Sequence, residues 1–170
     1  MLAAWYANLG VIEQTRLELS SYDPANFGDL TLDEVRQQLD LNQAIAYFDQ
    51  SLRWGPANRT ASQRLAEIFL SRGEYAQALS LMQAAWDTGH RDEITRMLMG
   101  DALVAQGDLQ AGAEIVRGLP HATGRLNTQA WYRYYRQADY ARATNAYQAV
   151  LVLDPDNSHA LNGLQAIPQP

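Results

Sequence analysis

The stretch GEYAQALSLM at 73–82 combines a glycine, an acidic residue, an aromatic residue and two alanines. A similar order returns as GDLQAGAEIV at 107–116 and, with alanine in place of the glycine, as ADYARATNAY at 138–147. Glycine readily takes the left-handed backbone conformation that ends many helices, and an acidic residue favours the start of the next helix. Each stretch therefore predicts a turn between two helices.

The three turns recur at nearly constant spacing. Tyr75 and Leu109 are 34 residues apart, and Leu109 and Tyr140 are 31 residues apart. The Pro-x-Asn turns at 56–58 and 155–157 are 99 residues apart, which matches two units of 34 residues and one of 31. Two independent sets of landmarks thus predict three repeated units.

Each unit is expected to be a pair of packed helices. Apolar residues fall at helical spacing before Gly73 and again after Tyr75. Small residues recur at matching places in the first two units, where they let the two helices approach closely. These small residues are Ala66, Gly100, Ala78 and Gly112.

The pattern of the units resembles the tetratricopeptide repeat (TPR) family, which places a small residue in the first helix, an aromatic after the turn, then an alanine, a large apolar residue and a closing proline. The residues that carry this resemblance are Ala66, Tyr75, Ala78 and Met82 in one unit and Tyr140, Ala143, Tyr147 and Pro155 in another. The resemblance implies an all-α, right-handed superhelical solenoid of antiparallel helix pairs. It also implies a protein or peptide partner bound on the concave face.

We expect one TPR domain over residues 1–170. Its predicted parts are a divergent repeat at 1–58 with an insertion at 22–40, repeats at 59–92, 93–123 and 124–157, and a capping helix at 158–170. Within the insertion, TLDE at 31–34 predicts a capping box that opens a short helix. We place a three-residue deletion in the irregular turn LPHATG at 119–124.

The composition excludes several classes of function. A formal net charge of -6 disfavours binding to nucleic acid, and the absence of cysteine removes disulfides and thiolate metal sites. No apolar run is long enough to insert into a membrane. We expect no cofactor and no metal. Formation of a homo-oligomer stays open.

The sequence contains no recognisable catalytic motif, and we therefore expect a protein that is not an enzyme. His90, His121 and His159 have no ligand spacing and fall in turns or at helix starts. The least favoured hypothesis is an enzyme that uses the insertion at 22–40 together with a turn histidine. Asn58 in the motif NRT is interpreted as a helix N-cap rather than as a glycosylation site.

The candidate binding site comprises residues on the first helix of each pair, which the family resemblance places on the concave face. They are Gln63, Arg64, Glu67, Leu70, Met97, Asp101, Val104, Arg125, Gln129, Tyr132, Tyr135 and Arg136. Tyrosine and arginine give contact area and charged hydrogen bonds to a peptide. The competing interpretation of WYRYYRQ at 131–137 is a surface coat over a core formed by Trp131 and Tyr134. We expect Trp54 and Trp86 to pack as well.

An alternative hypothesis concerns the context of the chain. The N-terminal hundred residues contain ANLG at 7–10, TRLEL at 15–19 and LNQAIAYFDQSLRWGPANRTASQRLAEI at 41–68. This combination looks like the C-terminal TPR segments of bacterial O-antigen ligase and polymerase-type membrane proteins, which would place the chain outside the membrane in support of envelope polysaccharide assembly. Transmembrane helices encoded upstream of Met1 would support this hypothesis, and a free-standing reading frame would exclude it. A free-standing protein would instead be expected in the cytoplasm, and the compartment stays open.

Overall fold

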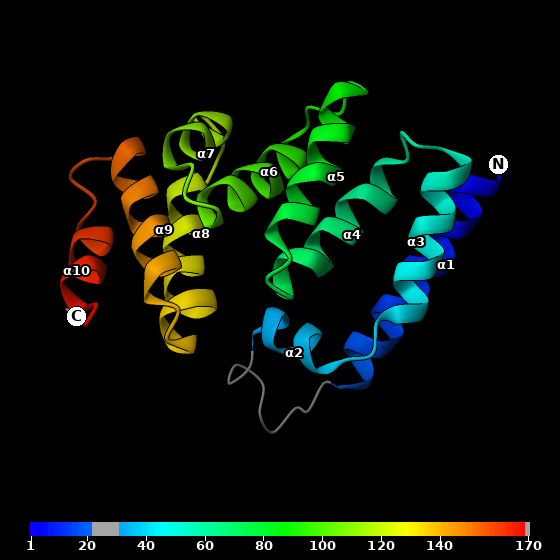
Figure 1. Cartoon of the computed structure of the whole chain (residues 1–170), viewed down its shortest axis with the longest axis horizontal. Helices are drawn as coiled ribbons and strands as arrows, with labels where there is room; N and C mark the ends of the chain where they lie inside the picture. The colour runs from blue at the N-terminus through cyan, green and yellow to red at the C-terminus, as the bar shows by residue number, and fades with distance from the viewer. Residues whose placement is uncertain (22–30, 169–170) are drawn as a thin grey trace. The chain divides into compact units, whose positions relative to one another are not determined.

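The computed structural model describes residues 1–21 and 31–168. In this part of the chain every regular element is helical and none is a strand (Figure 1). The prediction of an all-α fold of TPR-like helix pairs is therefore confirmed. The chain forms two compact units, Met1–Arg91 and Asp92–Pro170, each of which is described by itself. The single domain and the repeat bounds given above stay predictions.

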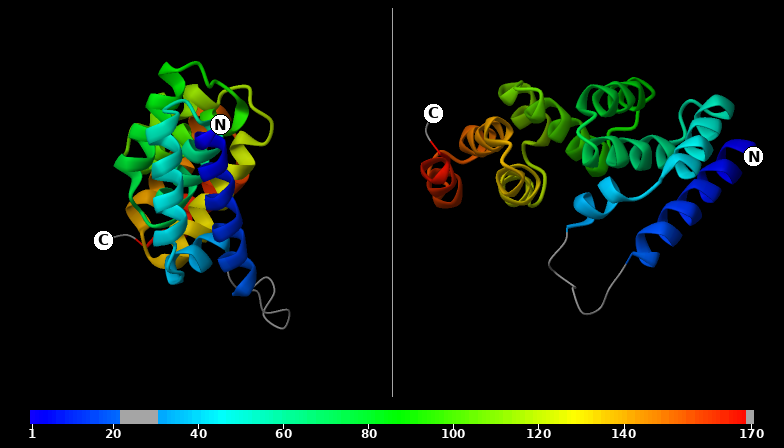
Figure 2. Two further views of the ribbon diagram at one scale, coloured as in Figure 1. Left: turned by 90° about the vertical axis from the view of Figure 1, so that its right-hand side faces the viewer. Right: turned by 60° about the horizontal axis from the view of Figure 1, so that its bottom comes forward.

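Within its described residues, 1–21 and 31–91, the first unit consists of two helix pairs and one short additional helix. α1 pairs with α3, which lies beside it in Figure 2, and α4 pairs with α5. The short helix α2 packs on α4 and on α1. The elements are α1 (Leu2–Ser20), α2 (Leu32–Gln38), α3 (Asn42–Trp54), α4 (Arg59–Ser71) and α5 (Tyr75–Asp87).

The core of the first unit joins α1, α3 and α4. Phe48 of α3 is fully buried, and its ring packs against α1 where Gly10 leaves no side chain, so that a Cβ on Gly10 would lie 2.5 Å from Phe48 Cε1. Small side chains allow these helices to approach closely enough to exclude water. The buried cluster is Ala7, Leu41, Ala44, Phe48, Ala61, Leu65 and Ile68.

The second unit also contains helix pairs, followed by one further helix. α6 pairs with α7, and the run from α8 through η3 pairs with α9, which also contacts α10. The elements are α6 (Glu93–Ala105), α7 (Leu109–Val116), α8 (Ala122–Thr128), the π-helix η2 (Gln129–Tyr134), the 3-10 turn η3 (Tyr135–Gln137), α9 (Tyr140–Leu153) and α10 (Ser158–Ala166).

Helix starts are fixed by local side-chain hydrogen bonds. Asn58 Oδ1 accepts from the backbone N–H of Ala61 at 3.0 Å, so the predicted N-cap is confirmed. The predicted capping box is confirmed too: Thr31 Oγ1 accepts from the Glu34 N–H at 3.3 Å, and the Glu34 carboxylate accepts from the Thr31 N–H at 2.6 Å. Each such bond satisfies an N–H group that the first helical turn leaves without a partner.

The three repeated turns share one left-handed backbone conformation. The residue after the first helix has a positive φ in all three, 78° at Gly73, 93° at Gly107 and 59° at Ala138. Alanine at the third turn therefore adopts a conformation that glycine takes without steric cost. The predicted helix ends are confirmed at all three turns.

The shortened repeat differs from the prediction. α7 has 8 residues where its counterpart α5 has 13, so the shortening affects the helix itself and not only the turn LPHATG. The partner run that follows contains a π-helix at Gln129–Tyr134, whose wider turns hold more residues than α-helical turns. A short second helix is thus followed by an irregular first helix.

Candidate functional site

All twelve predicted site residues lie on the first helix of a pair, but they differ in exposure. Gln63, Leu70, Asp101, Val104 and Gln129 are buried. The remaining residues, Arg64, Glu67, Met97, Arg125, Tyr132, Tyr135 and Arg136, are half-buried or exposed.

The structure corrects the assignment of Leu70 and Val104. These residues are only 1% and 2% exposed, and Val104 faces α7, where a Cβ on Gly112 would lie 2.6 Å from Val104 Cγ2. Neither side chain offers apolar surface to a partner. The apolar middle that we expected on the binding face is therefore absent at these two positions.

Three of the predicted residues in the second unit meet in one hydrogen-bonded network. Asp101 Oδ2 accepts from Arg125 Nη2 at 2.6 Å, from Arg125 Nε at 3.1 Å and from Gln129 Nε2 at 2.6 Å. The Asp101 side chain is 1% exposed, and a carboxylate is tolerated there because charged and polar donors surround it. The network links α6 to α8 and η2, and it leaves the Asp101 carboxylate little capacity to bind a partner.

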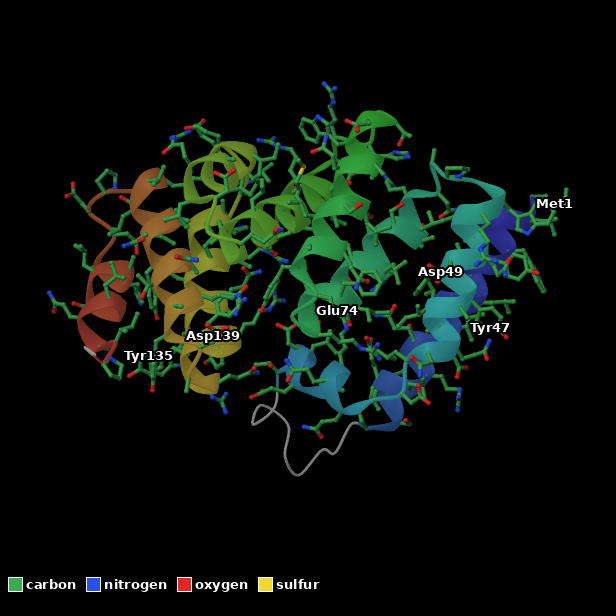
Figure 3. All side chains as sticks on the ribbon, in the orientation of Figure 1. Met1, Tyr47, Asp49, Glu74, Tyr135 and Asp139 are labelled. Carbon is green, nitrogen blue, oxygen red and sulfur yellow. The ribbon has the colours of Figure 1, made fainter. Side chains whose placement is uncertain are left out.

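Four neighbouring side chains on η2 and η3 are named here the aromatic patch (Trp131, Tyr132, Tyr135 and Arg136), and all but the half-buried Tyr135 are exposed. Trp131 and Tyr132 are each 42% exposed. The rings of Trp131 and Tyr135 stack with centroids 4.7 Å apart, and the Arg136 guanidinium lies 5.7 Å from the Tyr132 ring centroid. The Tyr135 hydroxyl donates to the Ala166 carbonyl at 3.2 Å, which places this ring, labelled in Figure 3, beside α10.

The exposure of Trp131 contradicts the expectation that it packs in the core. Tyr134 takes the interior position and is 2% exposed. Both residues lie in the π-helix η2. Trp54 of the first unit is exposed as well, at 60%, so the packing expected for it is also wrong.

A cavity of about 310 Å³ adjoins the aromatic patch and lies among α8, η2, α9 and α10. Trp131 belongs both to the patch and to the cavity wall. The buried Tyr147 also lines the cavity, and burial raises the pKa of its hydroxyl, with a smaller contribution from Tyr135. The lining residues are Asn127, Trp131, Tyr147, His159, Asn162, Gly163 and Ala166.

In the first unit, the predicted residues Arg64 and Glu67 lie next to α2. The Glu67 carboxylate accepts from Arg64 at 3.3 Å and from Arg36 of α2 at 3.4 Å. Arg36 also donates to Glu18 of α1 at 2.7 Å. The short helix of the insertion therefore occupies part of the face that the sequence assigns to a partner. The capping box predicted this helix, but no local signal indicated where it packs.

The catalytic alternative gains no support within the described residues. They contain no group of three or more His, Asp or Glu side chains placed to hold a metal ion. His90 hydrogen-bonds the Ala57 carbonyl at 2.7 Å, which ties one inter-repeat turn to another. Of the insertion at 22–40, residues 22–30 lie outside the described part.

In the described part no helix has the length and apolar content needed to cross a bilayer.

Comparison with known proteins identifies the repeated helix pairs. A family model described as tetratricopeptide repeat matches residues 36–99. This segment belongs to the tetratricopeptide repeat family. The TPR match contains α3, α4 and α5 and extends into α2 and α6, so it reaches further toward the N-terminus than the three units seen in the sequence. TPR segments typically mediate protein–protein interaction and carry no catalytic groups. No curated protein matches the chain.

Proposed function

We propose that this chain is a non-catalytic interaction module that binds a protein or peptide partner on the first helices of its helix pairs. Two kinds of observation support the proposal. Residues 36–99 are TPR sequence, and TPR segments typically bind proteins. The first helices also carry the exposed aromatic and arginine side chains among the predicted site residues.

The aromatic patch is the observation that carries the proposal. Tryptophan, tyrosine and arginine supply most of the binding energy at many protein interfaces, since they combine large contact area with hydrogen-bonding groups. Here their positions are already restrained by the stacking of Trp131 on Tyr135 and by the Tyr135–Ala166 hydrogen bond. A preorganised surface loses less side-chain entropy on binding. The patch therefore suits an extended or helical peptide.

Affinity capture with a patch variant tests this proposal. The chain and the triple variant Tyr132→Ala, Tyr135→Ala, Arg136→Ala are immobilised, and bound proteins from the native lysate are quantified by mass spectrometry. We expect the chain to enrich at least one protein. The recovered amount of that protein should be about tenfold lower, or lower still, with the variant, because hot-spot side chains are lost.

The matched control changes three exposed side chains on a second helix of the same unit and its C-cap, Gln110, Glu114 and Arg117, to alanine. These side chains pair only with one another in exposed positions, so their loss has little effect on stability. The control is expected to capture the same proteins as the unchanged chain. Equal recovery of every protein by chain, patch variant and control would contradict the proposal.

A further inference from the structure

The helix α2 is held on α1 and α4 mainly by polar contacts. Arg36 is its only buried residue, at 6% exposure, while Leu32 is 50% exposed. Arg36 Nε donates to Glu18 at 2.7 Å and Arg36 Nη2 to Glu67 at 3.4 Å. A helix of seven residues has little stability of its own, so these contacts determine whether it stays in place.

Two further contacts connect α2 to the end of α4. Ser71 Oγ donates to the Asp33 carboxylate at 2.6 Å, and Gln37 Nε2 donates to the Ser71 carbonyl at 2.7 Å. The α1 and α4 side of the contact is named here the α2-binding face and consists of Gln14, Glu18, Glu67 and Ser71. All of these residues lie within the first unit.

A buried amide group lies beside the carboxylate that holds Arg36, because Gln14 Nε2 and Arg36 Nε donate to the same Oε1 atom of Glu18. Gln14 is 1% exposed, and its Nε2 donates to the Glu18 carboxylate at 2.8 Å. Its Oε1 is buried without a hydrogen-bond partner in the part of the chain that the structure describes. An unpaired buried acceptor is costly, and a guanidinium group offers five N–H donors in a fixed plane. The face thus has the chemistry of an arginine site.

We propose that the α2-binding face is a docking site for an arginine-bearing helix of a partner protein, and that α2 occupies this site when the partner is absent. The inference rests on the proposed function, since it adds a second surface and a partner chemistry to the same interaction module. The partner helix places its arginine between Glu18 and Glu67, where Arg36 now lies. Binding displaces α2.

Charge and connectivity favour a separate partner over a second copy of this chain. Two carboxylates at the face and a formal net charge of -6 attract a cationic helix. A second copy would have to supply its own α2, which is followed closely by Leu41. Leu41 is fully buried in the core of its own unit, so reciprocal exchange of α2 strains that core in two chains, whereas a separate partner displaces α2 in one chain only.

Competition between α2 and a peptide in trans tests the proposal. The probe is a fluorescein-labelled peptide of residues 31–41, held helical by a lactam bridge from Glu34 to a lysine introduced by Gln38→Lys. Its affinity for the full chain is measured by fluorescence anisotropy. In the unchanged chain, α2 competes with the probe for the α2-binding face. The apparent affinity for the probe therefore falls as the fraction of molecules with α2 on this face rises.

The full-chain variant Arg36→Ala is expected to bind this peptide about tenfold more tightly than the unchanged chain, because the charged contacts that hold α2 are lost. Gln37→Ala alters an exposed residue and keeps Arg36, so we expect a smaller increase in affinity for the peptide. This variant replaces Arg36→Ala in the experiment if Arg36→Ala fails to fold. Arg16→Ala, on α1 but paired only with Glu13, is the matched arginine control and leaves the affinity unchanged.

A probe peptide carrying Arg36→Ala should bind the Arg36→Ala chain about tenfold more weakly than the original probe. Equal binding of the two probes, or of the probe to all chain variants, overturns the proposal. A dimer of the unchanged chain that Arg36→Ala dissociates, measured by light scattering, assigns the face to a second copy and also overturns it. The aromatic patch variant should bind the probe normally, so failure here is separable from failure of the capture experiment.

Discussion

Ala138 occupies a backbone conformation that is unfavourable for an alanine. Its φ is 59°, in the left-handed region, at the position where the other two repeated turns have Gly73 and Gly107. The Cβ of an L-residue crowds the following carbonyl in this region at a cost of about 1 kcal/mol. The turn forms nevertheless, since the backbone N–H of Ala138 donates to Tyr135 at 3.0 Å and that of Asp139 to Tyr134 at 3.0 Å.

The substitution Ala138→Gly should therefore raise the free energy of unfolding. We expect a gain of about 1 kcal/mol or slightly less, because glycine removes the steric strain but adds freedom to the unfolded chain. Urea unfolding followed by circular dichroism measures the change. The control is Ala141→Gly at an exposed position in α9, which should lose about 1 kcal/mol from helix propensity. A destabilised Ala138→Gly variant would show that steric strain does not govern the stability of this turn.

The paired helices α6 and α7 approach so closely that glycine is needed on both sides. A Cβ on Gly112 would lie 2.6 Å from Val104 Cγ2 and 3.1 Å from the backbone carbonyl oxygen of Gly100. A backbone carbonyl in a packed helix has no free rotation with which to move away. The contact therefore fixes the separation of the two helices.

The same Gly-to-Ala change at two helical positions tests this packing. Gly112→Ala should lower the free energy of unfolding by about 1–3 kcal/mol, because overpacking outweighs the gain in helix propensity. A Cβ added to Gly124 in α8 would meet no neighbouring atom within 4 Å, so Gly124→Ala should be neutral or stabilising by up to about 1 kcal/mol. Thermal and urea unfolding of both variants measure the difference. Equal effects at the two sites would contradict the close approach of α6 and α7.

At the scale of the whole molecule, features with a local cause could be predicted from the sequence. The N-cap at Asn58 and the left-handed residue at Gly73 depend on residues only a few positions away, and both are confirmed. The helix pairs could be predicted as well, because each pair is marked by a turn whose residues are close together in the sequence and recur at nearly constant spacing. The TPR match at 36–99 is consistent with that pattern.

Features that depend on neighbouring elements could not be predicted. Leu70 and Val104 share the helical spacing of exposed positions, yet both are buried. Trp131 was expected in the interior but is 42% exposed, and it lies in a π-helix that no sequence pattern indicated. The contact of Arg36 with Glu18 and Glu67 joins residues far apart in the chain, so no local pattern indicates the position of α2.

The central claim is that the first helices of the pairs, and not the second helices, hold the partner. The chain contains no cysteine, so a photocrosslinker can be attached at a single introduced cysteine. The measurement compares Tyr132→Cys on a first helix with Gln110→Cys on a second helix, each labelled with benzophenone maleimide and irradiated with the captured partner. The account predicts a crosslinked partner from Tyr132→Cys and none from Gln110→Cys. Crosslinking from Gln110→Cys alone would contradict it.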